Sequence, residues 1–495
     1  MATGLLIFAV FLVAAALMFF RKLPALLALP LMAVAIVCVE IAQGRLSEAD
    51  LWSAVVADGA VRLADPIVIS LFGGMLSLLM QKAGVAESLV RRGAELAGDN
   101  PWAVSLIMLV IITILFTTIG GLGAVIMVGT MVLPILLSIG VRDYIAAGVM
   151  VTGISLGGLL NAGNWTVYRT VLSLESDTVS SFALVLFGVS CLVAVVFLTV
   201  ELLRTGVFRL RRRSAAGAAK WILALAVLAG VWRAGAGLVG SLEAANAVRL
   251  VLSAGGVLLL AGIVIDRVRA FRAGSSGAVR WYAYLIPLVP LVLILLYGLP
   301  FLPAFMLGLG YGILATFRRG MVNLTSRAII EGSASVIPAV VLMIGIGMLL
   351  SAILGPTPTG AGSYWYAGPE VRVWPVLADM KPLLETIVPD SFLSYVVIFA
   401  LLGPFALYRG PLNVWGLGYG VGGILLATGI PAGAVMGILM SLGMIQGVSD
   451  PTNTANVWIA NEVRLDVNSI MWRTLPYAWL MATLGLVAAG MRYML

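Results

Sequence analysis

The sequence predicts an all-α polytopic membrane protein, with about 12 transmembrane helices, two re-entrant hairpins and two broken helices in two inverted-topology repeats. Of the 495 residues, 61% are hydrophobic and 11% are charged, whereas soluble proteins have about 45–50% apolar and about 25% charged residues. The mean hydropathy is +1.10, and apolar runs reach roughly twenty residues, the length of helix that crosses about 30 Å of hydrocarbon. These values exclude a soluble enzyme, a disordered chain, a secreted disulfide scaffold and a membrane β-barrel.

The residue types narrow the function classes further. The chain has no histidine, which excludes zinc-peptidase motifs, Ser-His-Asp triads and histidine proton relays. The two cysteines, Cys38 and Cys191, lie in apolar runs and are expected to be buried packing residues. We therefore expect neither an enzyme nor a cofactor, with sodium as the one candidate ion, and no nucleic-acid partner despite a net charge of +8.

Hydropathy places spanning helices along the whole chain. The predicted spans are 4–20, 23–41, 66–83, 142–175, 180–203, 221–240, 246–265, 281–298, 299–316, 336–354, 431–466 and 471–492. Two of them, 142–175 and 431–466, are too long for one crossing and have polar interiors, which predicts broken helices. The apolar stretches 102–140 and 392–429 are each interrupted by a glycine-containing segment, so we interpret them as re-entrant hairpins.

The distribution of Lys and Arg predicts the orientation. Most basic side chains fall on one side of the predicted spans, and the other side receives only Arg45, Arg62, Arg249, Arg372, Lys381 and Arg492. Because Lys and Arg are enriched in cytoplasmic loops, we expect both termini to face outward, in the inner membrane of a bacterium.

The two halves of the chain resemble each other. One constant shift matches Gly121 with Gly410, Gly148 with Gly437, Gly158 with Gly447 and Asn164 with Asn453, and farther upstream Gly59 and Gly74 parallel Gly332 and Gly347. An odd number of crossings separates equivalent elements, so the halves run in opposite directions, as in the inverted repeats of secondary transporters.

This alignment divides the chain into three parts. Residues 1–203 form the first repeat and residues 281–495 the second. Residues 204–280 are a two-helix insertion with basic cytoplasmic loops. Within the second repeat, 355–391 is expected to be an outer segment, because its Trp and Tyr residues suit an interfacial helix or lid.

The polar interruptions of the two long spans are the candidate binding elements. Pro451 removes a backbone donor and disfavours helix at Asp450, so this break has a local cause. Freed carbonyls and Asn, Thr and Ser oxygens suit a hard cation, and freed amides at half-helix N-termini attract carboxylates. The candidate substrate-binding residues are Asn161, Asn164, Thr166, Thr452, Asn453, Thr454 and Asn456 in the breaks, and Gly121, Gly123, Gly410 and Asn413 at the hairpin tips.

Three charged residues have candidate roles. Asp450 is the candidate coupling carboxylate, with Ser449 beside it, because a proton symporter without histidine must use Asp or Glu. Arg169 and Arg409 are the arginines that the predicted spans leave deep, and a guanidinium fork can hold a carboxylate. Each arginine could instead neutralise Asp450 or extend to the membrane surface.

Three stretches of the sequence resemble known carriers. Residues 73–103 are similar to the third-span region of gluconate permeases, 120–157 to the first hairpin of TRAP-type large permease subunits, and 461–476 to citrate–proton symporters. The motifs are Gly73-Gly74-Met75, Gly120-Gly121-Leu122-Gly123 and Asn461-Glu462-Val463-Arg464. The chain thus resembles the Ion Transporter superfamily of secondary carriers. The insertion has no counterpart, and residues 450–454 replace the Ser-Asn-Thr signature of sodium–dicarboxylate carriers, so the coupling ion stays open.

The resemblance implies a secondary active transporter, in which cation-coupled symport of an organic anion, expected to be a carboxylate, occurs by an elevator-type motion in a homodimer. Coupling has a physical reason, since moving each negative charge inward costs about 2.3 kcal/mol per 100 mV of membrane potential. The alternatives are a sodium/proton antiporter, in which Asp450 alternates between the two ions, and an anion efflux carrier. An intramembrane enzyme and a passive channel are disfavoured, because the sequence has no nucleophile motif and paired hairpins suit alternating access.

Overall fold

The computed structural model describes residues 2–20, 22–207, 242–273, 279–356, 374–384, 389 and 391–495. Every regular element in these residues is a helix, which confirms the all-α prediction. The predicted span 221–240 and most of the outer segment 355–391 lie outside the described residues.

The helices follow one another with short connections. The first half contains α1 (Ala2–Phe19), α2 (Ala25–Ala42), α3 (Glu48–Asp50), η1 (Leu51–Asp58), α4 (Gly59–Val61), α5 (Ala64–Lys82), α6 (Val85–Ala97), α7 (Pro101–Phe116), α8 (Gly121–Ser138), α9 (Asp143–Leu159), α10 (Ala162–Leu172) and α11 (Ser176–Arg204). The second half contains α13 (Leu242–Arg272), η2 (Trp281–Leu288), α14 (Val289–Tyr297), α15 (Phe301–Ala315), α16 (Met321–Leu354), α17 (Pro375–Leu384), α18 (Phe392–Leu401), η3 (Gly403–Ala406), η4 (Val414–Gly418), α19 (Tyr419–Ala427), α20 (Ala432–Ser449), α21 (Thr454–Glu462) and α22 (Val467–Tyr493).

Several of these helices can cross a membrane. Seven in the described part of the chain are long and apolar enough, or eight if the bent pair α9–α10 counts as one span. The seven are α2, Glu48–Lys82, α8, α11, α16, Ala432–Glu462 and α22. Five further apolar helices have 10–17 residues. A polytopic membrane protein is therefore confirmed, whereas the total of about 12 crossings stays a prediction.

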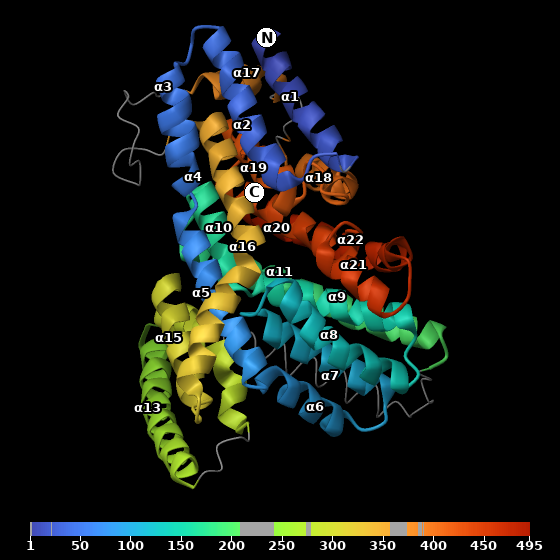
Figure 1. Cartoon of the computed structure of the whole chain (residues 1–495). Helices are drawn as coiled ribbons and strands as arrows, with labels where there is room; N and C mark the ends of the chain where they lie inside the picture. Colours follow the sequence, from blue (N-terminus) through green and yellow to red (C-terminus); the bar gives the residue numbers. More distant parts are fainter. Residues whose placement is uncertain are drawn as a thin grey trace.

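A column of long helices forms one part of the molecule (Figure 1). Within it, α2 and α5 pack along α16, which has 34 residues and is therefore about 50 Å long at about 1.5 Å per residue. Helices α6–α9 and α20–α22 stack beside the column and run obliquely to it. The column and this oblique stack are the two bodies between which the candidate site lies.

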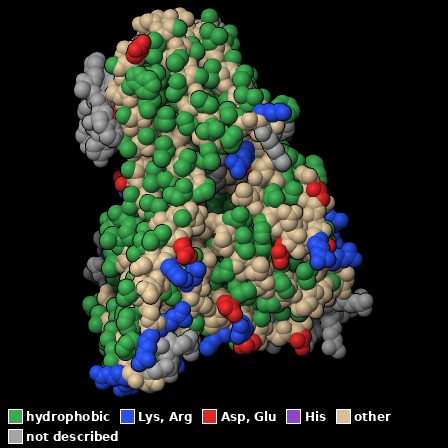
Figure 2. Space-filling model, viewed as in Figure 1, with side chains coloured by type: hydrophobic (Ala, Val, Ile, Leu, Met, Phe, Trp, Pro, Cys, Tyr) green, Lys and Arg blue, Asp and Glu red, His purple; other side chains and the backbone are tan. Residues whose placement is uncertain are grey.

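The surface carries the signature of a membrane protein. Hydrophobic side chains cover much of the face in Figure 2, and charged side chains gather toward its lower and right-hand margins. On α1, Leu5, Leu12 and Val13 are each more than half exposed. Cys38 is exposed and Cys191 is half-buried. The prediction that both cysteines are buried is therefore wrong, because hydropathy does not distinguish a lipid-facing position from a core position.

Glycine backbones join the segment Glu48–Lys82 to α16 at two points. A Cβ atom on Gly59 would lie 2.8 Å from the Cα atom of Met348, and one on Gly347 would collide with the carbonyl oxygen of Gly59. At the second point, a Cβ atom on Gly332 would lie 2.6 Å from the carbonyl oxygen of Gly74. The two segments therefore run antiparallel and approach too closely for side chains, as small residues permit in membrane helices.

A buried carboxylate ties α11 to two helices of the oblique stack. Glu201 of α11 is 2% exposed. It accepts hydrogen bonds from the hydroxyl groups of Tyr144 on α9, at 3.0 Å, and Tyr477 on α22, at 2.7 Å. Arg204 pairs with the same carboxylate at 3.0 Å. These three donors satisfy a group that would otherwise be costly to bury.

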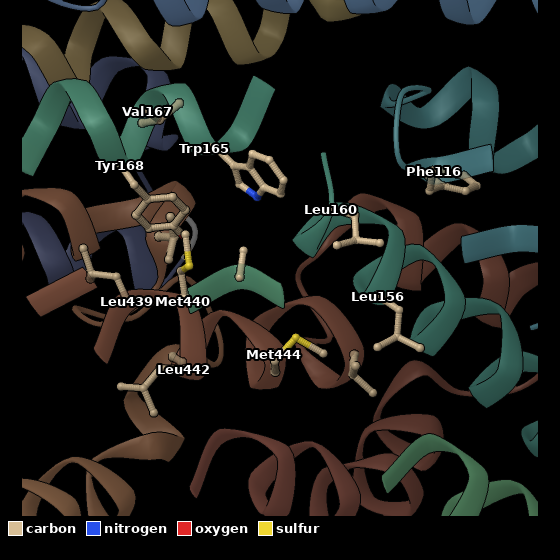
Figure 3. Packing of buried hydrophobic residues seen from close by; sticks show 14 of the residues in the cluster. Phe116, Leu156, Leu160, Trp165, Val167, Tyr168, Leu439, Met440, Leu442 and Met444 are labelled. Atoms are coloured by element: carbon tan, nitrogen blue, oxygen red, sulfur yellow. The ribbon is translucent and has the colours of Figure 1, made fainter. Parts of the chain in front are cut away.

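Apolar side chains hold α9 and α10 against α20. Figure 3 shows them gathered in one cluster, to which α9 contributes Leu156, α10 contributes Trp165 and Tyr168, and α20 contributes Met440 and Met444. All five are buried. Two interrupted spans from opposite halves of the chain are therefore packed side by side through a continuous apolar core.

Candidate functional site

The first break separates α9 from α10 with a bend of 54°. Asn161 is the N-cap of α10, and its side-chain oxygen accepts a hydrogen bond from the amide of Gly163 at 2.9 Å. The side chain of Asn164 donates to the carbonyl oxygen of Gly158, also at 2.9 Å. Asparagine favours a cap over a helix interior, so these two residues explain why the predicted span 142–175 is broken here.

The 117–120 turn connects α7 with α8. Gly121 has a φ of +80°, a conformation that favours glycine. The N-cap residue Gly120 offers no side chain to the amides of the first turn of α8, which have no partner within the helix. Thr118 is 2% exposed, and its hydroxyl group has no hydrogen-bond partner among the described residues. The turn thus presents uncapped amides and an unused hydroxyl group.

Helices α7 and α8 pack side by side on either side of this turn. That arrangement agrees with the hairpin predicted for 102–140. However, α8 has 18 residues and is long enough for a crossing of its own. Re-entry of the hairpin therefore stays a prediction.

A cavity of about 170 Å³ lies where the 117–120 turn and the first break meet α5, α15 and α16. It is lined by Ile69, Ser70, Gly73, Gly74, Thr118, Gly120, Gly121, Asn161, Gly163, Asn164, Phe305, Val336, Ala339 and Met343, none of which is charged. Three predicted site residues, Gly121, Asn161 and Asn164, belong to this lining. Because the N-termini of α8 and α10 both reach the cavity, their partial positive charge favours an anionic group there.

The other predicted residues of the first half lie outside the lining. Gly123 is exposed, and Thr166 is buried with its hydroxyl group bonded within α10. Arg169 forms an ion pair with Asp65 of α5 at 3.1 Å, and 37% of its side chain is exposed. Of the roles that the sequence leaves open for Arg169, the structure shows an ion pair with Asp65 and none with the candidate coupling carboxylate.

The second break, residues 450–453, separates α20 from α21 and is organised by Asp450, which is 2% exposed. Its Oδ1 atom accepts hydrogen bonds from the amide of Tyr408 at 3.0 Å and from the amide and hydroxyl group of Thr452 at 2.9 and 2.8 Å. Its Oδ2 atom accepts one from the side chain of Asn413 at 3.0 Å. The carboxylate therefore fastens the loop 407–413, between η3 and η4, to the second break.

The neighbouring polar residues also have protein partners. The side chain of Asn456 donates to the carbonyl oxygen of Asp450 at 3.0 Å, and that of Asn453 caps α21 by accepting from the amide of Ala455 at 3.1 Å. The hydroxyl group of Ser449 lies 2.9 Å from that of Thr474. Thr454 is exposed. The second break is thus a closed hydrogen-bond network in this conformation.

The loop 407–413 is conformationally strained. Tyr408 and Arg409 have φ values of +54° and +56°, which residues other than glycine rarely adopt. A Cβ atom on Gly410 would collide with the carbonyl oxygen of Phe405. Such strain persists only where the surroundings impose it and often accompanies a functional element, and here Asp450 supplies the constraint.

The predicted hairpin 392–429 has arms with different neighbours. Helix α18 packs on α22, whereas α19 packs on α16 and α20. Arg409 is half-buried in the loop between them and forms no ion pair with a carboxylate in the described residues. Residues 409–413 and 449–456 do not line the cavity. The structure therefore joins each break to the turn or loop of its own half.

The sequence missed the cavity wall on α5, α15 and α16. Ser70, Phe305 and Met343 read as packing positions of apolar helices, and nothing local distinguishes them from the residues around them. Thr118 follows another threonine at the end of an apolar run and gave no signal either. Of this wall, the sequence indicated only Gly73 and Gly74, which belong to the motif that resembles gluconate permeases.

Comparison with known proteins adds no assignment. No protein-family model matches the chain, and no curated protein matches it either. Function has to be argued from the cavity and the two breaks.

Proposed function

We propose that the protein is a secondary active transporter that carries a small organic anion, a carboxylate, together with a proton or sodium ion by elevator-type alternating access. The observation that carries the proposal is the cavity between the 117–120 turn and the first break. Two half-helix N-termini, those of α8 and α10, reach a partly open cavity that has no charged side chain among its described lining residues. That combination suits an anion held by backbone amides inside a membrane protein.

Reciprocal contacts support the inverted repeat. The sequence equates Gly59 with Gly332 and Gly74 with Gly347. In the structure Gly59 touches Gly347, and Gly332 touches Gly74. Under a two-fold relation, every contact between two residues is matched by a contact between their two equivalents. The two glycine contacts form such a matched pair.

A second pair of contacts follows the same rule. Gly129 of α8 abuts Trp458 of α21, and the ring of Tyr419 of α19 packs at a tilt of 60° against that of Tyr168 of α10, with ring centroids 5.7 Å apart. When the shift that relates the two halves is applied to Gly129 and Trp458, the resulting positions are each one residue away from Tyr419 and Tyr168. The two pairs of reciprocal contacts together support the proposed inverted repeat, which suits alternating access between mirrored states.

Asp450 is the proposed coupling group. In this conformation all its contacts come from donors, at Tyr408, Asn413 and Thr452. A proton on Oδ2 would take up the second lone pair of that oxygen and make the carboxyl group neutral, which weakens the hydrogen bonds that it accepts. Protonation would thereby loosen the loop 407–413, which links the coupling ion to motion of the second half. Sodium would act instead by replacing the donors around the same oxygens.

We further propose a homodimer in a bacterial inner membrane with both termini outside. The orientation follows from the bias of Lys and Arg along the sequence. Labelling of cysteines placed at each terminus of intact cells with an impermeant maleimide tests it. Protection of both termini would contradict the orientation.

The test of function is uptake into proteoliposomes. Purified protein is reconstituted, and labelled carboxylates are offered under an inward proton gradient, an inward sodium gradient or a membrane potential alone. Concentrative uptake that depends on one of the ion gradients supports the proposal. Absence of carboxylate uptake under every gradient would refute it.

A sodium/proton antiporter is the second candidate. It is favoured by one observation, since neither Arg169 nor Arg409 reaches the cavity and an antiporter needs no arginine for an anion. The same proteoliposomes, loaded with a pH-sensitive dye, distinguish the two. Sodium-driven pH changes without any carboxylate would establish the antiporter.

A further inference from the structure

We infer that the substrate of the cavity is a small monocarboxylate with an apolar body, not a dicarboxylate, a tricarboxylate or a polyhydroxy acid. The inference rests on the proposed function, because it takes the cavity as the place of the transported anion. Three features carry it: unused donors for one carboxylate, no cationic side chain for a second one among the described lining residues, and an apolar opposite wall.

The donors for one carboxylate lie at the start of α8. Thr118 is 2% exposed, lines the cavity, and has a hydroxyl group without a partner among the described residues. Buried polar groups are nearly always hydrogen-bonded, so an unused one calls for a missing acceptor. Beside it, the first amides of α8 are uncapped. A hypothetical Cβ atom on Gly120, which lines the cavity, would meet nothing within 4 Å, so a ligand has room beside this turn.

A second carboxylate would find no cationic partner among the described lining residues, which include no Lys or Arg. Asn161 uses its side-chain oxygen for the amide of Gly163, and Asn164 uses one N–H for the carbonyl oxygen of Gly158. The amide N–H groups that remain and the hydroxyl group of Ser70 are neutral donors. Because a second buried charge without a cation is costly, a dianion is disfavoured.

The opposite wall is apolar and the space is small. Ile69, Phe305, Val336, Ala339 and Met343 provide it from α5, α15 and α16. The cavity volume is about 170 Å³, and an apolar cavity of about 150 Å³ holds benzene. A molecule of roughly six to eight non-hydrogen atoms therefore fits, with its carboxylate at α8 and its hydrocarbon part against this wall.

The first experiment compares substrates on the intact protein in proteoliposomes. Butyrate and 3-methylbutanoate are tested against succinate, citrate and gluconate, each as a labelled substrate and as a competitor. Uptake of the two monocarboxylates, with competition at least about tenfold weaker from the others, is expected, since each unpaired buried group carries a large penalty.

The second experiment replaces the hydroxyl group. Thr118→Val keeps the shape of the side chain and should raise the KM for butyrate about tenfold or more, because it removes one hydrogen bond to a charged group. Thr113→Val is the matched control. Thr113 is also a buried threonine of the same helix–turn unit, but its hydroxyl group bonds to the carbonyl oxygen of Leu109 and does not line the cavity. It should leave the KM unchanged.

A third variant keeps the inference testable if Thr118→Val fails to fold. Met343→Ala enlarges the apolar wall, and we expect it to shift the preference from butyrate to hexanoate. An unchanged chain-length preference, or equal KM values for the two threonine variants, would overturn the inference. Transport of succinate or citrate that butyrate does not inhibit would overturn it while leaving the proposed function intact. No carboxylate transport at all would refute both.

Discussion

Replacement of the second-break carboxylate is the most direct test of the structure. In Asp450→Asn, the amide oxygen can keep the three hydrogen bonds now made to Oδ1 by Tyr408 and Thr452. Its NH₂ group would then face the NH₂ group of Asn413, now 3.0 Å from Oδ2. Rotating the amide of Asn413 does not help, because the same nitrogen also donates to the carbonyl oxygen of Ala406 at 2.9 Å.

The magnitude follows from these contacts. The substitution removes one hydrogen bond to a charged group and leaves two donors opposed, which together cost roughly 2–4 kcal/mol of unfolding free energy. Asp450→Ala should cost more, since three N–H donors lose their acceptor. We therefore expect Tm to fall by a few degrees for the asparagine variant and further for the alanine variant.

The assay combines stability with transport. Thermal unfolding of the detergent-solubilised variants gives the order of Tm, and proteoliposome uptake gives the dependence on the ion gradient. We expect Asp450→Asn to lose gradient-driven uptake while it still folds. Limited proteolysis should show increased cleavage within the loop 407–413, because its attachment to the second break is weakened.

Two outcomes would refute this reasoning. An unchanged Tm in both variants would mean that the carboxylate does not fasten the loop. Normal coupled uptake by Asp450→Asn would remove this residue from the coupling mechanism. A double-mutant cycle with Asn413→Ala separates the two roles, because it measures the pairwise hydrogen bond alone.

Three further substitutions test the fold by thermal unfolding in detergent. Gly332→Leu should cost about 1–3 kcal/mol or more, since its Cβ would collide with the backbone of α5; Gly310→Leu, whose Cβ meets nothing within 4 Å, is the control. Asp65→Asn should change stability by less than about 1 kcal/mol, because its ion pair is exposed. Glu201→Ala should cost roughly 2–4 kcal/mol, because two tyrosine hydroxyl groups lose their acceptor. Equal Tm values for the two glycine variants would contradict the close approach of α5 and α16. A large fall in Tm with Asp65→Asn, or no fall with Glu201→Ala, would contradict the contact assigned to that carboxylate.

The helix interruptions could be predicted because their causes are local. Pro451 cannot donate a backbone hydrogen bond, and Asn161 prefers a cap to a helix interior, so each break is visible within a few residues. The helices end at the same places in the structure. The membrane class followed for a similar reason, since apolar run length is a property of the chain alone.

The partners of the polar residues could not be predicted, because they come from distant parts of the chain. Asp450 bonds to Tyr408 and Asn413 rather than to an arginine. Arg169 pairs with Asp65, about a hundred positions away. Likewise, the missing partner of Thr118 depends on what surrounds its side chain, and hydropathy carries no information about that.

The glycine crossing restricts how the two bodies can move. Backbone atoms of α5 and α16 meet directly, so neither helix can slide or roll against the other without collision. In the proposed elevator motion, the pair is therefore expected to move as one unit, and the oblique stack is expected to move against it. Helix α10 packs mainly on α5 and is ion-paired to it, so it belongs with this unit. Since α5, α10 and α16 form one part of the cavity wall and the start of α8 another, such a motion would separate the two parts. The bound anion would then be uncovered by this separation, with no lid required.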